Sequence, residues 1–385
     1  MTGEKIIVAV GDAGAWQYFK PIFQQLRDHY DVELLADING AAIVELMREN
    51  VSHRATDGRY LLERDGLHGV SAILCGTAGK VFDLWRNATD ASIGRVPCAW
   101  FGDFYGSGCE AQVRGVTPDY LFTFDDTTAE RFLKIVPHLR TRTHVVGNPA
   151  FDAIADARLR LHRMREEARI MLDVVWSNPL VVYSASSAGQ FDLEESLRAL
   201  VQWVKAYTPT FPWTQSSVMK FAVRFHPADV KNKPEDVARL QRCVYEELGQ
   251  ERVVDLKDMK GLELASVADL LVTDYSTEVV KACLLGVPTA FVMLKSAQKY
   301  LRDAKGGEFP FLSILEEKPD SPAPALGVYA PDDMRQLNRV LSGAWTLRAR
   351  GALEHPRFSV LCDGEAGNRV LAGIKRVVES GLDLE

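Results

Sequence analysis

ADLLVTDYSTE, residues 268–278, is the stretch of this 385-residue chain that decides the fold. Its apolar run from Asp269 to Thr273 has the length and composition of a buried strand, and a helical pattern begins directly after Asp-Tyr-Ser-Thr. A buried strand that passes through a short polar turn into a helix is typical of parallel sheets covered by helices. The stretch therefore predicts an α/β fold.

The same alternation of apolar runs and helical patterns extends in both directions along the chain. In the second half, the other expected strands are Leu180–Tyr183, Met219–Phe225 and Thr289–Met293. In the first half, the expected strands are residues 5–10, 32–36, 70–74, 96–100, 120–124 and 144–146. Because strands and helices alternate in both halves, we predict two Rossmann-like domains, each with a parallel sheet.

The boundary between the halves follows GNP, residues 147–149, which ends the first series of strands. The next residues, 157–173, are charged and helix-forming, as expected of a linker. We predict an N-terminal Rossmann-like domain at 1–155, a linker at 156–175, a C-terminal Rossmann-like domain at 176–360 and a closing C-terminal helix at 361–385.

Composition excludes several classes of protein. The formal net charge is −7, so a nucleic-acid partner, which needs a basic face, is not expected. The six cysteines form no CxxC pair, which argues against a disulfide framework or a zinc site and fits a reducing compartment. No apolar run approaches the roughly 20 residues of a membrane-spanning helix, and no signal peptide precedes the first strand. We expect a cytoplasmic protein with at most peripheral membrane contact.

Ligands of parallel α/β sheets bind beyond the carboxyl ends of the strands, so the loops there are candidate sites. In the second half, DYST (274–277) can cap the next helix, whose free N–H groups can hold a diphosphate. His226, in RFHP (224–227), can neutralise a phosphate oxygen or transfer a proton, and SASSAG (184–189) offers small donors. An ordinary N-cap, a structural histidine and a plain turn fit the same residues. The candidate binding residues are Ser184, Ser186, Ser187, Arg224, His226, Asp274, Ser276, Thr277 and Glu278.

Two loops of the first half complete the candidate set. In GDAG (11–14), Gly11 and Gly14 let a ligand approach the backbone, although the GxGxxG dinucleotide fingerprint is absent. In WFGDFYG (100–106), Asp103 is a candidate general base, and the aromatic residues can stack on a sugar or a base. An Asp in a Gly-rich turn also commonly caps its own backbone, so a structural role stays open. Asp103 and His226 are the two catalytic candidates.

Taken together, these motifs resemble the GT-B superfamily of nucleotide-sugar-dependent transferases, most closely the group of CDP-glycerol glycerophosphotransferases and capsule-polysaccharide transferases. In that group one strand ends in His-Pro and a later one in Thr-Asp-Tyr-Ser-Ser, to which RFHP (224–227) and TDYST (273–277) correspond. LLGVP (284–288) and CDGEA (362–366) also look like that group's pattern. VGNPAFD (146–152) is similar to the interdomain segment of UDP-N-acetylglucosamine 2-epimerases and their transferase relatives.

The resemblance implies a GT-B fold, in which an acceptor domain and a nucleotide-donor domain face each other across a cleft. It implies metal-independent transfer of a glycosyl or glycerophosphoryl group from a CDP- or UDP-linked donor to a glycan or glycoconjugate acceptor, as in polysaccharide biosynthesis. The donor is then a substrate, and no separate cofactor is expected. The donor diphosphate is expected on the second half, and the acceptor near residues 11–14 and 100–105.

Three departures from the pattern keep other functions open. Phe101 stands where glycerophosphotransferases carry the histidine of Trp-His-Gly, which is expected to be their catalytic base. Lys281 stands where many GT-B enzymes have an acidic residue that binds the donor ribose, with Glu278 one turn earlier. The loop at 184–189 lacks a Thr-x-Arg segment. A sugar-nucleotide 2-epimerase or hydrolase, and a non-catalytic nucleotide-binding relative, are the alternatives. Such epimerases usually carry several first-domain carboxylates and a His-Arg segment, where this chain has His-Pro.

Overall fold

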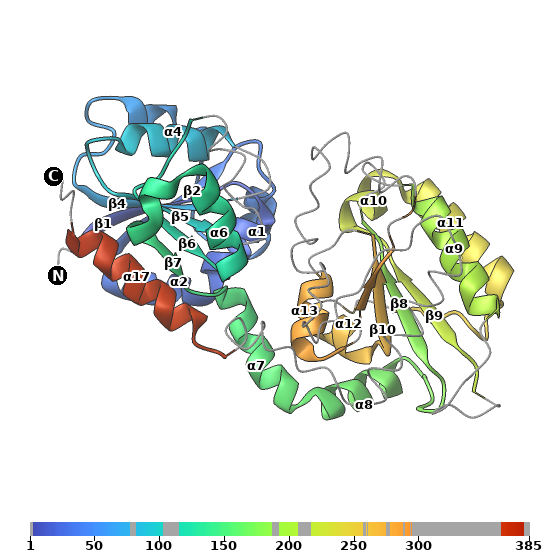
Figure 1. The fold of residues 1–385 in the computed structure, drawn as a ribbon. Helices are drawn as coiled ribbons and strands as arrows, with labels where there is room; N and C mark the ends of the chain where they lie inside the picture. Colours follow the sequence, from blue (N-terminus) through green and yellow to red (C-terminus); the bar gives the residue numbers. More distant parts are fainter. Residues whose placement is uncertain are drawn as a thin grey trace. The chain divides into compact units, whose positions relative to one another are not determined.

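The chain forms two compact units in a computed structural model (Figure 1). Unit 1 contains Met1–Ala153 and Ser359–Glu385, and unit 2 contains Ile154–Phe358. The structure describes residues 3–77, 82–102, 115–186, 192–206, 217–256, 259, 261–274, 278–287, 289–292, 294 and 363–380.

Unit 1 is built on a parallel sheet of seven strands in the order β3-β2-β1-β4-β5-β6-β7. The chain runs outward from β1 in one direction and then returns to β4 on the other side, which is the strand order of Rossmann folds. The strands are β1 (Lys5–Val10), β2 (Asp31–Asp37), β3 (Arg54–Thr56), β4 (Val70–Thr77), β5 (Cys98–Gly102), β6 (Tyr120–Thr123) and β7 (Thr143–Val145).

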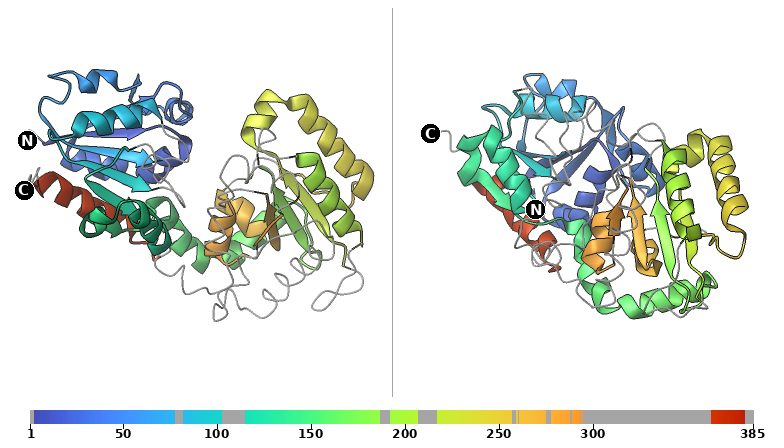
Figure 2. Two further views of the ribbon diagram at one scale, coloured as in Figure 1. Left: turned by 45° about the horizontal axis from the view of Figure 1, so that its top comes forward. Right: turned by 45° about the vertical axis from the view of Figure 1, so that its right-hand side comes forward.

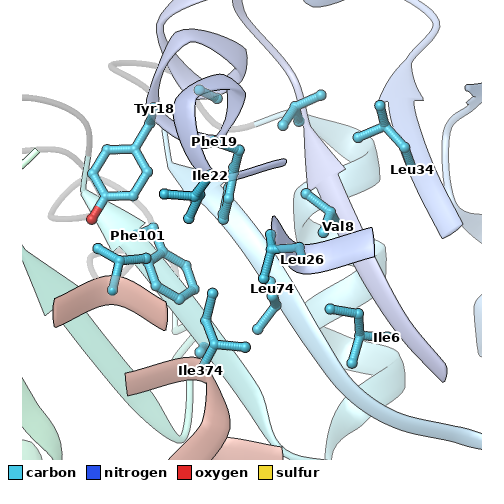
Figure 3. Packing of buried hydrophobic residues seen from close by; sticks show 14 of the residues in the cluster. Ile6, Val8, Tyr18, Phe19, Ile22, Leu26, Leu34, Leu74, Phe101 and Ile374 are labelled. Atoms are coloured by element: carbon cyan, nitrogen blue, oxygen red, sulfur yellow. The ribbon is translucent and has the colours of Figure 1, made fainter. Parts of the chain in front are cut away.

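Helices cover both faces of this sheet, so its strands read as continuous apolar runs rather than as alternating ones. Along β1, Ile6 and Val8 point to one face, and Ile7 and Ala9 point to the other. The first face carries α1 (Ala13–Phe19), η1 (Lys20–Ile22), α2 (Phe23–His29), α3 (Ala42–Arg48) and α17 (Ala366–Ser380). Figure 3 shows Phe19, Leu26 and Ile374 of these helices packed together with Val8 of β1. The second face carries η2 (Arg59–Leu62), α4 (Asp83–Ser92), α6 (Asp126–Ile135) and η3 (Pro137–Arg142).

Helix α17 is bonded to a segment of unit 1, residues 146–152, that is distant from it in sequence. The Asp152 carboxylate, just after η4 (Pro149–Phe151), accepts the N–H groups of Ala366 at 3.0 Å and Gly367 at 2.7 Å. Arg369 Nε donates to the Val146 carbonyl at 2.8 Å. These bonds cap the helix N-terminus, where free amides favour a carboxylate. The motif segments 146–152 and 362–366 are therefore parts of one junction.

Unit 2 contains a parallel sheet with the described strand order β11-β10-β8-β9. Helices α9 and α11 cover one face, and α12 and α13 lie on the other side (Figures 1 and 2). The strands are β8 (Leu180–Ser184), β9 (Lys220–Arg224), β10 (Leu270–Thr273) and β11 (Thr289–Phe291). The helices are α7 (Asp152–Leu159, which begins in unit 1), α8 (Leu161–Met171), α9 (Leu193–Ala206), α10 (Pro227–Asn232), α11 (Pro234–Leu248), α12 (Gly261–Val267) and α13 (Glu278–Leu285).

Residues 156–175, predicted from the sequence to be a linker, include the second half of α7 and all of α8. A buried ion pair holds α8 to the sheet of unit 2: Arg169 Nη1 lies 2.9 Å from Asp269 Oδ2. The same oxygen accepts the N–H of Leu180 at 2.7 Å. Arg165 of α8 donates to the carbonyl of Ser266 at 2.9 Å. The amino ends of β8 and β10 are thereby fixed to one helix.

The predicted α/β class, with a parallel sheet in each half, is confirmed. The apolar runs located the strands to within a few residues, but the three-residue β3 was missed because it has no buried residue to give an apolar signal. Along the parts of the chain that the structure describes, no helix is both long and apolar enough to cross a membrane.

Gly147 provides a test of the junction between the two motif segments. Its φ is +85°, and a Cβ there would lie 2.8 Å from Cβ of Ala366. We expect Gly147→Ala to cost unit 1 about 3 kcal/mol, from left-handed strain and from overpacking. The matched control is Gly69→Ala, where φ is +71° and a Cβ meets nothing within 4 Å, so strain alone applies, about 1 kcal/mol. Urea unfolding of both variants measures the difference, and equal losses would contradict the packing argument.

Candidate functional site

The carboxyl edge of the sheet in unit 2 brings three of the predicted loops together. Ser184 at the end of β8 pairs in register with Arg224 at the end of β9 and with Thr273 at the end of β10. The chain passes from β8 to β9 on one side and then to β10 on the other side of β8. Such a reversal of strand order is the place where open α/β sheets bind ligands.

The backbone that leaves β8 is held at three consecutive residues. The Ser184 carbonyl accepts the Thr273 hydroxyl at 2.7 Å. The Ala185 N–H donates to the Arg224 carbonyl at 2.9 Å. The Ser186 N–H donates to the carboxylate of Asp274. The ends of β9 and β10 thus determine the path of the chain where it leaves β8.

Asp274 lies directly after β10, and its side chain is completely buried. Its Oδ1 accepts the Ser196 hydroxyl of α9 at 2.6 Å, and its Oδ2 accepts the Tyr183 hydroxyl of β8. The N–H groups of Ser186 and of Asp274 itself also donate to this carboxylate. Burial raises the pKa of Asp274 to about 6, and the hydrogen bonds oppose that rise. The carboxylate is therefore directed toward protein donors rather than toward solvent.

The other predicted residues of unit 2 differ in exposure. His226 is exposed, and its carbonyl accepts the N–H of Asp229 at 2.9 Å in the first turn of α10. Arg224 is half-buried. Ser184 and Ser186 are almost fully buried. Ser187, Ser276 and Thr277 lie outside the described residues.

At the position where the sequence analysis noted a missing ribose-binding carboxylate, the structure shows an ion pair within α13. Lys281 Nζ lies 3.1 Å from Oε1 of Glu278, one turn earlier on the helix. Both side chains are half-buried. Glu278 is the first residue of α13, where a carboxylate is favoured by the helix dipole.

In unit 1, the predicted glycines lie on either side of an N-cap. The Asp12 carboxylate accepts the N–H of Ala15 at 2.8 Å and so caps α1. Gly11 is buried against the ring of Phe82, where a Cβ would lie 2.3 Å from Cδ2. Gly14 is exposed in the first turn of α1. Packing alone accounts for the glycine at position 11. Asp103 lies outside the described residues.

The prediction that the aromatic residues after residue 99 stack on a ligand is wrong for Trp100 and Phe101. Both have 0% exposed surface because they belong to β5 itself and point to opposite faces of the sheet. Trp100 Nε1 donates to the Thr89 hydroxyl at 3.0 Å. The Phe101 ring stacks on Phe122 with centroids 4.7 Å apart and planes at 6°. Phe101, at the position of the expected catalytic histidine, is a core residue.

Three carboxylates at the carboxyl edge of the sheet in unit 1 are bound to backbone amides. Asp12 caps α1, and Asp125 caps α6 through the N–H of Thr128 at 2.9 Å. Asp37 is buried at the end of β2, where it accepts the N–H of Leu84 at 2.9 Å. These side chains hold the turns in shape.

Tyr183 and Ser196 complete the surroundings of Asp274, and neither was predicted from the sequence as a site residue. A signal was present for each: a tyrosine inside the apolar run of β8, and a serine at the buried spacing of Leu193, Leu197 and Leu200 in α9. Buried hydroxyls need a partner, and only the structure shows which one they share.

Solved structures with the same fold are similar to almost the whole chain. A putative UDP-N-acetylglucosamine 2-epimerase from Listeria monocytogenes is 13% identical with a TM-score of 0.65, and the match covers 98% of this chain and 97% of that one. The UDP-GlcNAc 2-epimerase from Neisseria meningitidis, bound to UDP-GlcNAc, is 11% identical with a TM-score of 0.62, covering 97% and 100%. A variant of the wall teichoic acid polymerase TagF, soaked with CDPG, is 14% identical with a TM-score of 0.51, covering 97% and 89%.

These likenesses show that the chain has a GT-B-type fold, as the motifs predict. No protein-family model and no curated protein sequence matches the chain. At such low identity the fold is shared and the activity is a separate question, because one fold serves several chemistries.

The buried carboxyl of Asp274 makes the stability of unit 2 depend on pH. Its pKa in the folded chain is about 6, above the ordinary value of 3.8, so the folded chain holds this proton more tightly than the unfolded chain. The resulting stabilisation is fully present below pH about 4 and is lost as the pH rises through about 6, a change on the order of 3 kcal/mol.

Asp274→Asn removes this titration. We therefore expect the melting temperature of the variant, relative to the wild type, to rise between pH about 4 and pH about 7. Differential scanning calorimetry of both proteins across this range measures the trend. A difference that does not change with pH would show that Asp274 does not titrate there.

Proposed function

We propose that the chain binds a nucleotide-activated donor at the carboxyl edge of unit 2 and transfers a glycosyl or glycerophosphoryl group from it to a glycan or glycoconjugate acceptor. The donor carries a CDP or UDP group and is a substrate rather than a cofactor. Unit 1 binds the acceptor, and Asp103 is the proposed base. His226 offsets the negative charge that develops on the leaving diphosphate.

One observation carries this proposal: the ends of β8, β9 and β10 meet in register where the strand order reverses. Ser184 and Arg224, which the sequence predicts to hold a diphosphate, come from two of those ends, and the third end carries Asp274, whose buried carboxylate is bonded to protein donors. Parallel sheets bind ligands at such an edge, because the loops and helix N-termini there supply unpaired donors. The arrangement suits an anionic group that spans adjacent strand ends.

The similar structures support a nucleotide as the ligand. The Neisseria epimerase is bound to UDP-GlcNAc, and the TagF variant was soaked with CDPG. Both share the fold of this chain along nearly its full length. The His-Pro and Asp-Tyr-Ser-Thr segments favour the transferase, because they resemble the glycerophosphotransferase group.

A 2-epimerase or hydrolase acting on a sugar nucleotide is the second candidate, and the higher TM-scores of the epimerase structures favour it. The carboxylates that the structure describes at the carboxyl edge of the unit 1 sheet argue against it. Epimerases of this fold usually carry several first-domain carboxylates, whereas Asp12, Asp37 and Asp125 are all bound to backbone amides. A carboxylate that caps a helix is not available to move a proton at a sugar carbon.

A panel of nucleotides separates these functions. CDP, UDP, GDP, CMP and their sugar or polyol conjugates are each added to the protein, and the melting temperature is measured. A ligand that binds only the folded state must raise it, so we expect CDP- or UDP-linked compounds to do so. No shift with any compound would favour a non-catalytic relative of these enzymes. Incubation with UDP-sugars and no acceptor gives the second readout, since an epimer or free UDP would identify the second candidate.

His226→Ala tests the donor site directly. Loss of a hydrogen bond to a charged phosphate oxygen costs about 1.5–3 kcal/mol, so we expect nucleotide binding to weaken by roughly ten- to hundredfold. The matched control is Lys231→Ala, which removes an exposed cation from α10, the helix that begins directly after His226. Isothermal titration calorimetry measures both. Unchanged affinity and turnover in His226→Ala would remove this histidine from the mechanism.

A further inference from the structure

Strand β10 has a buried carboxylate at each end, and the two are compensated in different ways. Asp269, before the strand, faces a buried guanidinium, with Arg169 Nη1 at 2.9 Å from its Oδ2. Asp274, after the strand, receives its hydrogen bonds from two hydroxyls and two backbone amides. Both side chains have 0% exposed surface. The nucleotide donor is predicted to bind near the carboxyl end of β10. At that end, the buried carboxylate therefore has uncharged partners.

Burial does not favour the ionised form of the Asp274 carboxyl. Removing an ionised carboxylate from water is unfavourable when its partners are neutral, and the raised pKa of Asp274 reflects that cost. The ionised form is therefore less favourable for folding than the protonated carboxyl of the same side chain. A reason for this side chain has to come from what it holds in place.

The hydrogen-bond geometry supplies that reason. A carboxylate has about four lone-pair sites and no donor. Asp274 faces four donors: the hydroxyls of Tyr183 and Ser196, and the N–H groups of Ser186 and of Asp274 itself. An asparagine has one oxygen and would turn an N–H group toward these donors. Only the ionised aspartate accepts from all four.

Three of the four donors belong to other segments, and the fourth is the N–H of Asp274 itself. Tyr183 is in β8, Ser186 follows β8, and Ser196 is in α9. Through one carboxylate, the end of β10 is bonded to strand β8, to the backbone that follows β8 and to helix α9. Of these bonds, the one to the Ser186 N–H holds backbone at the predicted donor edge.

We propose that Asp274 is a positioning residue of the donor site: its carboxylate fixes the backbone at Ser186 relative to the end of β10, and it does not itself contact the donor. This inference rests on the proposed function for the identity of the ligand. A binding site needs supporting residues that keep its backbone in place, because a displaced backbone would misplace the hydrogen-bond donors that it carries. The Asp274 carboxylate has this supporting role.

The test compares Asp274→Asn and Asp274→Ala with Ser196→Ala. The last variant removes one donor to Asp274 but keeps its bond to the Ser186 amide, so it is the matched control. Hydrogen exchange at the Ser186 amide is measured in the absence of ligand. We expect exchange to become at least tenfold faster in both Asp274 variants and to change little in Ser196→Ala. Unchanged exchange in the Asp274 variants would overturn the proposal whatever the ligand is.

Nucleotide affinity gives the functional readout at a temperature where all the variants are folded. We expect the Kd for CDP or UDP, whichever binds the wild type, to rise about tenfold in Asp274→Asn and to stay within about twofold in Ser196→Ala. Equal affinity in Asp274→Asn and wild type would overturn the positioning role. If the wild type binds neither nucleotide, the proposed function fails, and exchange at Ser186 still decides whether Asp274 holds this backbone.

Discussion

The burial of a carboxylate at the end of β10 is the constraint on which the predicted donor edge depends. An isolated ionised carboxylate is too costly to bury, so Asp274 requires donors from several directions. Those donors come from β8, from the chain that leaves it, and from α9. The requirement therefore fixes where three segments end relative to one another. At the opposite end of the strand, Asp269 imposes a similar requirement and satisfies it with Arg169 of α8.

Carboxylates at the carboxyl edge of the other sheet hold mainly local structure. Asp12 and Asp125 each cap the helix that comes after their own strand, which needs only residues within three positions. Asp37 reaches further, to the amide of Leu84. In unit 2 the corresponding carboxylate, Asp274, binds hydroxyls 78 and 91 residues away in sequence. A loop held by such distant contacts keeps its shape only in the folded domain.

This difference explains how much of the molecule could be predicted from its sequence. The strands and their order of appearance follow from local apolar runs, because burial on both faces of a parallel sheet leaves a signal in every residue. The loops that reach the donor edge were also found, since each comes directly after such a run. The partners of Asp274 were not, because a hydrogen bond over many residues leaves no periodic pattern. For the same reason Trp100 and Phe101 were interpreted as ligand contacts, although they are the last apolar residues of a strand.

The burial of Phe101 also bears on how a GT-B fold acquires its chemistry. A histidine at this position would lie in the aromatic cluster with Phe122 and Tyr18, where an ionisable ring is desolvated. The residue that differs from the glycerophosphotransferase pattern is therefore used for packing, and its replacement does not by itself remove a catalytic group from an accessible site. The base that we propose, Asp103, comes after β5 in the sequence. On this fold the nature of the reaction depends on the loop residues beyond the strand ends, and the strands themselves serve to bring those ends together.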